Sequence, residues 1–450
     1  MQVIVGIDLG STTTKAVLID PDGRLVGRGI TNSRSNYEVA CAIARQEALT
    51  AVRFNMLERA IEELEGDASR TLLSLQTRLS EAFRLELYLT ELVGLREEIL
   101  GLLDQPHLAQ HRAELEPAAT HVLDSMAAAA PMLFLGGVER RSDFFRDLAG
   151  AAFMSESEVL CKDGAVSFER LVGLYDRAIL EVETRVVPHD FGALLGRAGK
   201  RVTSLKWTGA GDAPLSPQQS ESVLLDVVNR VAAMPLEELT FVGTGYGRQT
   251  LPFPKAAVRS EILCHGRGAH RLFPGTRTVL DIGGQDTKAI QVDEHGVVTS
   301  FQMNDRCAAG CGRYLGYIAD ELNLGLHELG PLALKAERQV RVNSTCTVFA
   351  GAELRERLSL GQRREDILAG LHRAIMLRAM SLLARSGVIR DEFTFTGGVC
   401  KNPMATKILR ELVTENYSAD ITLNAHPDSI FMGALGAALF GLDDVRAGKP

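Results

Sequence analysis

Aromatic residues and cysteines are both scarce in this sequence. Its 450 residues include one tryptophan and seven cysteines. So few cysteines exclude a dense disulfide framework and fit a reducing compartment. The formal net charge is -8, which argues against a nucleic-acid partner because such proteins carry a basic stripe or patch.

Long apolar runs are also missing. The longest, residues 126–138, contains Pro131 and two glycines and is shorter than the roughly 20 residues that cross a bilayer. The chain begins with strand-like residues and not with a charged segment followed by an apolar one. These features predict a cytoplasmic protein with no membrane partner. The 46% hydrophobic and 24% charged residues are ordinary for a globular chain, and the length suggests about three domains.

A repeated segment is the most informative feature that is present. Residues 7–20, IDLGSTTTKAVLID, return as residues 280–293, LDIGGQDTKAIQVD. In each copy an apolar run ends in Asp-x-Gly, passes through small polar residues and becomes a second apolar run, which predicts a strand, a tight turn and a strand. A single glycine-rich turn could serve the backbone alone, but the duplication favours paired phosphate loops.

Two facing loops of this kind would clamp the polyphosphate of ATP. Glycine lets the backbone approach a phosphate closely, and successive N–H and hydroxyl groups donate to its oxygens. Asp8, Asp281 and Gln285 are the expected catalytic residues, because an acid at the end of a strand can hold a hydrated Mg²⁺ or orient the attacking water. The expected phosphate-binding residues are Gly10, Ser11, Thr12, Thr13, Lys15, Gly283, Gly284, Asp286 and Lys288.

Two cysteines, Cys307 and Cys346, each precede a stretch with helical spacing of apolar residues. The N-terminus of a helix lowers the pKa of a thiol and stabilises anionic ligands. A zinc ion or an iron–sulfur cluster usually has four protein ligands, and two thiolates supply half of them. Such a site would be completed either by Cys311 and another thiol of this chain or by a pair of thiols from a second subunit. Packing as small apolar side chains is the alternative, and it is the favoured interpretation for Cys311.

A third glycine-containing segment ends an apolar strand predicted at residues 392–396. Gly397 and Gly398 leave room for a flat base and ribose, and Lys401 and Asn402 follow as possible contacts. An ordinary turn from strand to helix is the alternative. The position of this glycine-containing segment after two phosphate loops favours an adenosine site.

A mainly helical insert, residues 37–220, interrupts the first half. The first subdomain region is then residues 1–36 and 221–290, and the second is residues 291–450. Residues 38–104 place leucines on one helical face. The insert either has an interior of its own or docks on another subunit.

Six motifs occur in order along the chain: DLGSTTTK, GTGYGR, DIGGQDTK, NDRCAAG, NSTCTVFA and TGGVCKN. This set resembles the ATPase family that includes activators of 2-hydroxyacyl-CoA dehydratases and the ATPase subunits of benzoyl-CoA reductase. The resemblance implies the α/β fold of actin, Hsp70 and sugar kinases, with duplicated three-layer, ribonuclease-H-like subdomains. It also implies that Cys307 and Cys346, with two cysteines of a partner subunit, hold one [4Fe–4S] cluster.

The insert resembles the larger ATPase subunit of a benzoyl-CoA reductase. That resemblance implies an ATP-hydrolysing electron-transfer subunit with ATP, Mg²⁺ and the shared cluster as cofactors. Its expected partners are a second, smaller ATPase subunit, two catalytic reductase subunits and a ferredoxin. The alternatives are a homodimeric activator of a 2-hydroxyacyl-CoA dehydratase, a sugar or acyl kinase, and a chaperone-like binding module.

Overall fold

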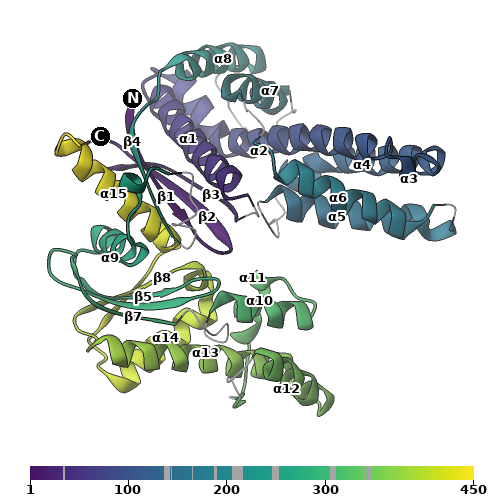
Figure 1. Cartoon of the computed structure of the whole chain (residues 1–450). Helices are drawn as coiled ribbons and strands as arrows, with labels where there is room; N and C mark the ends of the chain where they lie inside the picture. The colour runs from purple at the N-terminus through teal and green to yellow at the C-terminus, as the bar shows by residue number, and fades with distance from the viewer. Residues whose placement is uncertain are drawn as a thin grey trace. The chain divides into compact units, whose positions relative to one another are not determined.

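A computed structural model describes most of the chain, and its residues form two compact units (Figure 1). The helical unit is mainly Thr50–Pro235, and the core unit consists of Gln2–Ser33, Ala40–Leu49 and Leu236–Pro450. The described residues are 1–33, 36–135, 142, 144–164, 166–186, 190–204, 216–245, 253–304, 311–338, 340–342 and 347–449.

The first sheet of the core unit has four strands: β1 (Gln2–Leu9), β2 (Thr13–Ile19), β3 (Leu25–Asn32) and β4 (Glu237–Gly245). Their order across the sheet is β3-β2-β1-β4. β1 pairs with β2 antiparallel and with β4 parallel. β1 is almost entirely buried, as expected for a central strand made of valine, isoleucine and leucine.

The second sheet repeats this arrangement and adds a strand. It consists of β5 (Thr276–Ile282), β6 (Thr287–Val292), β7 (Val298–Asn304), β8 (Glu392–Thr396) and β9 (Thr422–Ala425). The order is β7-β6-β5-β8-β9, with β5 antiparallel to β6 and parallel to β8. Both predicted hairpins and the predicted strand at residues 392–396 are therefore confirmed.

The repeat extends to the pairing register. Asp8 lies opposite Lys15, and Asp281 lies opposite Lys288. Each aspartate thus sits near the end of a central strand, directly across from the lysine of its own hairpin. Register fixes which side chains share a face, so the duplication of sequence is also a duplication of geometry.

Two helices, α9 (Glu261–Leu272) and α15 (Met432–Arg446), pack closely against each other in the core unit. A Cβ atom added to Gly436 would lie 1.8 Å from the carbonyl oxygen of Cys264. Backbone therefore contacts backbone at this crossing, and only glycine fits. α15 also packs on β1, so α9 is held near the first sheet as well as the second.

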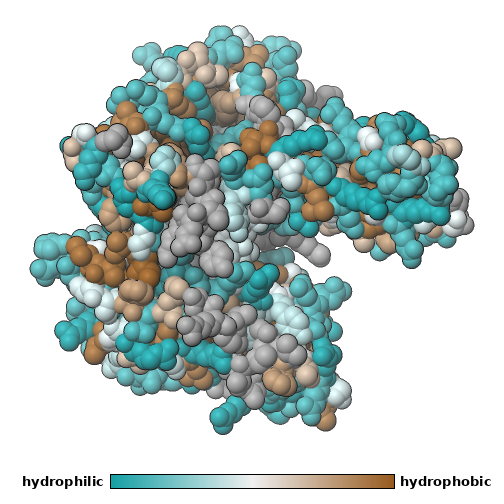
Figure 2. Space-filling model, viewed as in Figure 1, coloured by the Kyte–Doolittle hydropathy of each residue, from teal (hydrophilic) through white to brown (hydrophobic). Residues whose placement is uncertain are grey.

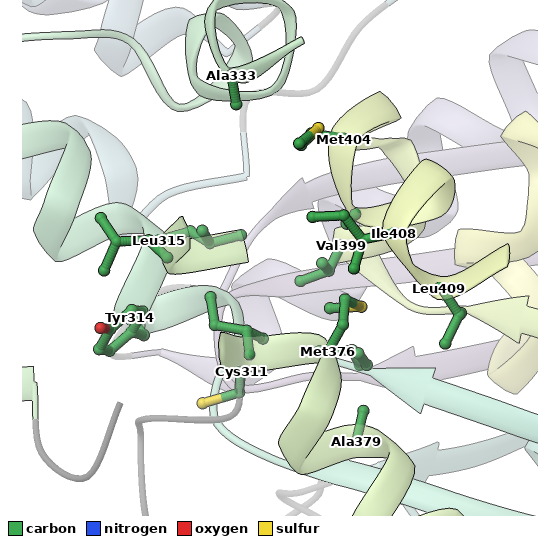
Figure 3. Close-up of a cluster of buried hydrophobic side chains, with 14 of the residues drawn as sticks. Cys311, Tyr314, Leu315, Ala333, Met376, Ala379, Val399, Met404, Ile408 and Leu409 are labelled. Carbon is green, nitrogen blue, oxygen red and sulfur yellow. The ribbon is translucent and has the colours of Figure 1, made fainter. Parts of the chain in front are cut away.

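The remaining core helices are α10 (Gly312–Glu321), α11 (Leu326–Ala333), α12 (Thr347–Ser359), α13 (Arg364–Ser386) and α14 (Pro403–Asn416). α13 packs on β6 and β7 of the second sheet, and the other four pack on α13 or on one another. Their apolar faces form one buried cluster, part of which Figure 3 shows. Cys311 is 1% exposed and lies in this cluster with Tyr314, Leu315 and Met376. Cys311 is therefore packed among apolar side chains, in agreement with the favoured interpretation.

The helical unit has an interior of its own, formed by two buried apolar clusters. Its helices are α1 (Tyr37–Glu62), α2 (Asp67–Leu102), α3 (Pro106–Ala109), α4 (Arg112–Leu135), α5 (Phe145–Leu160), α6 (Phe168–Glu183), α7 (Phe191–Ser204) and α8 (Pro217–Ala233). Glu86 is 6% exposed, and the guanidinium groups of Arg197 and Arg201 both bond its carboxylate. Such pairing is what permits a charge to be buried.

The contacts follow different boundaries from those that the sequence suggests. The predicted boundary between residues 290 and 291 lies inside β6, a strand of the second sheet. The expected insert, residues 37–220, includes part of α1 that belongs to the core unit. There, Gly29 of β3 approaches α1 so closely that an added Cβ would lie 2.2 Å from the carbonyl oxygen of Ala44. At its other end the helical unit includes α8 and continues to Pro235.

Two helices, α4 and α13, are long and apolar enough to cross a membrane by length and composition alone. The apolar window of α13 is 72% buried and that of α4 is 39% buried. Both helices contribute residues to the apolar clusters of their own units. On the face in Figure 2, hydrophilic residues predominate and hydrophobic residues form separate patches.

Candidate nucleotide site

The turn between β1 and β2 is held by its own backbone and by a serine that follows β3. The N–H of Gly10 donates to the carbonyl oxygen of Thr13 at 3.2 Å. The hydroxyl of Ser33 donates to the carbonyl oxygen of Gly10 at 2.5 Å. The backbone N–H of Ser33 donates to the carbonyl oxygen of Thr12 at 2.8 Å. Ser33 was not among the predicted site residues because it lies outside the repeated segment.

The turn between β5 and β6 has the same internal bond. The N–H of Gly283 donates to the carbonyl oxygen of Asp286 at 3.0 Å. In addition, the first N–H groups of α10, from Gly312 and Arg313, donate to the carbonyl oxygens of Gly283 and Gly284, both at 2.8 Å. The second loop is therefore attached directly to the start of α10.

The two loops meet in the core unit. A Cβ atom added to Gly284 would lie 2.0 Å from Oγ1 of Thr12 and 3.5 Å from Oγ of Ser11. Gln285 lies in the same turn and is half-buried. The structure thus brings together the residues that the repeat predicts for two facing phosphate loops.

Asp8 is 2% exposed at the end of β1. Its Oδ2 lies 3.8 Å from Nε2 of His265 and 4.0 Å from Nζ of Lys15. Its Oδ1 has no hydrogen-bond partner within the described part of the chain. A buried carboxylate oxygen without a donor is costly, so this atom is suited to a bound cation or a water molecule.

Asp281, the equivalent residue of the second sheet, has several partners. It accepts a hydrogen bond from Oγ1 of Thr396 at 2.9 Å, and Nδ1 of His265 lies 3.3 Å from its Oδ1. Burial alone would raise the pKa of Asp281, but His265, Lys288 and the Thr396 hydroxyl together lower it to about 2. The carboxyl group is therefore ionised at neutral pH.

Lys288 is 1% exposed and enclosed by three carboxylates. Its Nζ lies 2.8 Å from Asp286, 2.9 Å from Glu261 and 3.5 Å from Asp281. Burial would lower the pKa of Lys288, but these acids raise it above its ordinary value. The ammonium group is thus a fixed positive charge beneath the second loop.

Two residues of α9, Glu261 and His265, were missed by the sequence analysis. They are four residues apart, and therefore on one helix face. Asp8, Glu261 and His265 place ligand atoms within 4.8 Å of one another, an arrangement that could hold a cation. The available signal was an acidic residue and a histidine at i and i+4 on one helix.

In the expected adenosine segment, the space beside Gly398 is open, whereas the space beside Gly397 is filled by backbone atoms. Gly397 has φ of 84°, and an added Cβ would lie 2.3 Å from the carbonyl oxygen of Ile282. At Gly398 an added Cβ would meet nothing within 4 Å, so that position is open, as a base-binding turn requires. Lys401 is exposed and lines an open surface pocket of about 970 Å³ with Cys400, residues along the length of α14 and residues 425–427.

Asn402 has a structural role in this segment. Its Oδ1 accepts from the N–H groups of Met404 and Ala405, which caps α14. Its Nδ2 donates to Nε2 of His372 at 2.9 Å, and Nδ1 of that buried histidine donates to the carbonyl oxygen of Leu368 at 2.7 Å. Burial lowers the pKa of His372 to about 4, which keeps the ring neutral.

The predicted cluster ligands, Cys307 and Cys346, lie outside the described residues, as do the segments 305–310 and 343–346 around them. The helices expected after them are present. α10 begins at Gly312 and α12 at Thr347. The two cysteines therefore remain predicted ligands.

Known proteins match this chain in sequence. Residues 5–441 match the profile of the BadF/BadG/BcrA/BcrD ATPase family. The (R)-2-hydroxyglutaryl-CoA dehydratase activating ATPase of Acidaminococcus fermentans is 38% identical over 243 residues, 54% of this chain and 89% of that protein. One of the benzoyl-CoA reductase subunits of Thauera aromatica is 34% identical over 210 residues, 47% of this chain and 74% of that protein.

Solved structures match the fold. Component A of the Acidaminococcus fermentans (R)-2-hydroxyglutaryl-CoA dehydratase superposes with a TM-score of 0.52 at 21% identity, covering 99% of this chain and 100% of that chain. The activator of the 2-hydroxyisocaproyl-CoA dehydratase from Clostridium difficile, with bound ADPNP, superposes with a TM-score of 0.50 at 21% identity. This match covers 99% of this chain and 96% of that chain. The predicted actin-like ATPase fold is confirmed, and both of its sheets are mixed.

Proposed function

Because the chain belongs to the BadF/BadG/BcrA/BcrD ATPase family, we propose that it hydrolyses ATP between its two loops and uses the reaction to drive electron transfer. The observation that carries the proposal is the contact between Gly284 and Thr12. It brings two copies of one phosphate-binding turn face to face. Each copy has an aspartate and a lysine in the same register.

For the ATPase step, each group of the site has a distinct role. The free Oδ1 of Asp8 is suited to hold the hydrated Mg²⁺ of Mg–ATP, and Lys15 lies beside the same carboxylate. Asp281, ionised and fixed by Thr396, is suited to accept a hydrogen bond from the attacking water. Gln285 would orient that water from the second loop. N–H groups and hydroxyls of both loops would bind the phosphate oxygens.

For the adenosine, Gly398 supplies the open surface and Lys401 the exposed cation. Asn402 would act mainly through α14, since its side-chain oxygen is engaged in the cap. One N–H of its amide remains for a ligand beyond the bond to His372. The adenosine contact of Asn402 is therefore the weakest of the proposed nucleotide contacts.

For electron transfer, Cys307 and Cys346 would hold a [4Fe–4S] cluster with two cysteines of a partner subunit. Such a cluster supplies a one-electron carrier whose potential depends on hydrogen bonding and solvent exposure. The bonds from Gly312 and Arg313 to the second loop give a direct route from nucleotide to α10. A loop that moves with ATP and ADP would carry the start of this helix with it.

Two partner systems are consistent with the family. We favour a benzoyl-CoA reductase, in which a ferredoxin donates the electrons, a smaller ATPase subunit completes the cluster, and two catalytic subunits reduce the aromatic ring. The feature that supports it is the helical unit, a separately packed body inserted into the first half. A homodimeric dehydratase activator is the second candidate. It is supported by the higher sequence identity to such an activator, 38% against 34% for the reductase subunit.

Anoxic purification with iron and sulfide analysis tests the proposal. Cys307→Ser and Cys346→Ser should each remove the iron, because a hard alcohol replaces a soft thiolate. Cys161→Ser, Cys264→Ser and Cys400→Ser should retain it. Unchanged iron in either of the first two variants would contradict the assignment. Co-purification with a second ATPase chain would support the reductase, whereas an iron-containing self-dimer would support the activator.

A further inference from the structure

We infer that His265 is a positioning residue that sets the spacing of Asp8 and Asp281, the acids of the two opposed strands. The inference rests on the proposed ATPase site. Nδ1 of the imidazole lies 3.3 Å from Oδ1 of Asp281, and Nε2 lies 3.8 Å from Oδ2 of Asp8 and 3.9 Å from Oε1 of Glu261 on its own helix. The histidine is 4% exposed.

The chemistry of the ring suits this position. An imidazole carries its two nitrogens at different positions of one rigid plane, and each of them can lie beside a carboxylate. One side chain can therefore address two acids that come from different sheets. Nδ1 of His265 has no hydrogen bond within the described part of the chain, so the contact with Asp281 is close but not yet a formed bond. Catalytic hydrogen bonds of this kind often tighten only when substrate binds.

The backbone of α9 is fixed where it presents His265. A Cβ atom added to Gly268, one turn later, would lie 2.0 Å from the carbonyl oxygen of Met432 in α15. On the other side, Glu261 bonds Lys288 at 2.9 Å, which connects α9 to the second hairpin. The ring is thus carried by a helix that is held to both halves of the core unit, and it cannot follow one acid without the other.

Replacing His265 with asparagine or with glutamine tests its contacts with Asp281 and Asp8 one at a time. In His265→Asn the new amide would stand near the position of Nδ1 and preserve the contact with Asp281. In His265→Gln the longer side chain would place its amide near the position of Nε2 and preserve the contact with Asp8. His265→Ala would lose both contacts.

The test measures ATP turnover, the KM for ATP and the thermal unfolding midpoint of the full chain. A displacement of about 1 Å in a reacting group can cost about 10²-fold in rate. We therefore expect kcat to fall about 10²-fold in His265→Ala and less in His265→Asn and His265→Gln, with KM within about threefold. His270→Asn is the matched control on the same helix, where Nε2 contacts the carbonyl oxygen of Glu294, and it should keep the parental kcat.

The outcomes separate this inference from the proposed function. Parental kcat in all three His265 variants, or a loss confined to KM, would overturn the positioning role while the ATPase assignment stands. A parent chain that neither binds nor hydrolyses ATP would overturn the proposed function itself. If His265→Ala unfolds, the two amide variants decide, because equal and parental kcat in both would still contradict the inference.

Discussion

Lys15 and Lys288 occupy equivalent positions in the two sheets but have different surroundings. Each lies opposite the aspartate of its own hairpin. The side chain of Lys15 is 12% exposed and lies 4.0 Å from Asp8, whereas that of Lys288 is 1% exposed and has three carboxylate partners. The first lysine is therefore suited to bind a ligand, and the second to neutralise buried acids.

Lys15→Ala should impair ATP binding, whereas Lys288→Ala should impair folding stability. Lys15→Ala should raise the KM for ATP and leave the unfolding midpoint nearly unchanged. Lys288→Ala leaves buried carboxylates without their cation, which typically costs about 3–5 kcal/mol, so it should lower the midpoint strongly. Calorimetry and ATP titration distinguish the two. The interpretation fails if Lys15→Ala binds ATP with parental affinity.

Amides in place of the two acids should reduce catalysis without removing iron. Asp8→Asn and Asp281→Asn should each lower ATP turnover by about 10²–10⁴-fold, the usual range for positioning and electrostatic effects. Asp22→Asn, at a side chain that is 70% exposed, serves as the control. Parental turnover in both site variants would refute the phosphate-loop assignment.

The crossing of α9 and α15 should tolerate no added methyl group. Gly268→Ala would force the backbones apart, at a cost of about 1–3 kcal/mol or more, and should lower ATP turnover because α9 carries Glu261 and His265. Gly316→Ala, in α10 of the same unit, meets nothing within 4 Å and should stabilise the chain by about 0.5–1 kcal/mol. Equal unfolding midpoints for the two variants would contradict the tight crossing.

Acid should destabilise the core unit through His372. The folded pKa of about 4 lies below the ordinary value of 6.5, so the unfolded chain binds the proton more readily. The contribution of the neutral ring is fully present above pH 6.5 and is lost as the pH falls toward 4. His372→Gln, which can still accept from Asn402, should show a smaller fall in unfolding midpoint between pH 7 and pH 5. His295→Gln, at a side chain that is 78% exposed, should behave like the parent.

Removal of the helical unit should leave a folded ATPase. Arg45 of α1 and Glu238 of β4 form an ion pair at 2.6 Å, so the chain leaves and re-enters the core unit at neighbouring points. A short Gly/Ser linker from residue 49 to residue 236 should preserve ATP binding and iron, but abolish association with the catalytic subunits that we propose as partners. Full ring-reducing activity in the trimmed protein would show that the helical unit is not needed for that association. A cut at residues 37–220 should fold poorly, because it removes the part of α1 that packs on β3.

The repeat made much of the site predictable, because each copy encodes a complete hairpin with its acid, glycine and lysine. The register of Asp8 with Lys15 follows from the turn length and the period of two. The strand at residues 392–396 was predictable from its apolar run and the glycines that end it. The helical character of residues 38–104 was predictable from the spacing of their leucines, although Gly66, at φ of 66°, separates α1 from α2 within this stretch.

What could not be predicted depends on contacts between distant segments. His265 lies on a helix outside the repeat, and nothing in its local sequence indicates that it faces both Asp8 and Asp281. The unequal surroundings of the two lysines depend on Glu261, which is also distant in sequence. The position of Asn402 after a glycine pair indicates a ligand contact, whereas tertiary packing makes it the cap of α14.

The strand order also carries information about the history of the chain. In the first half, the helical unit lies between β3 and β4; in the second, α10 to α13 lie between β7 and β8. These are equivalent connections of one duplicated unit. Both copies therefore carry their largest group of helices at the same connection, as a separate helical body in one and as the helices that follow the two cysteines in the other. The connection between the third and fourth strands of the repeated unit is thus the place where this fold accommodates added chain in both halves.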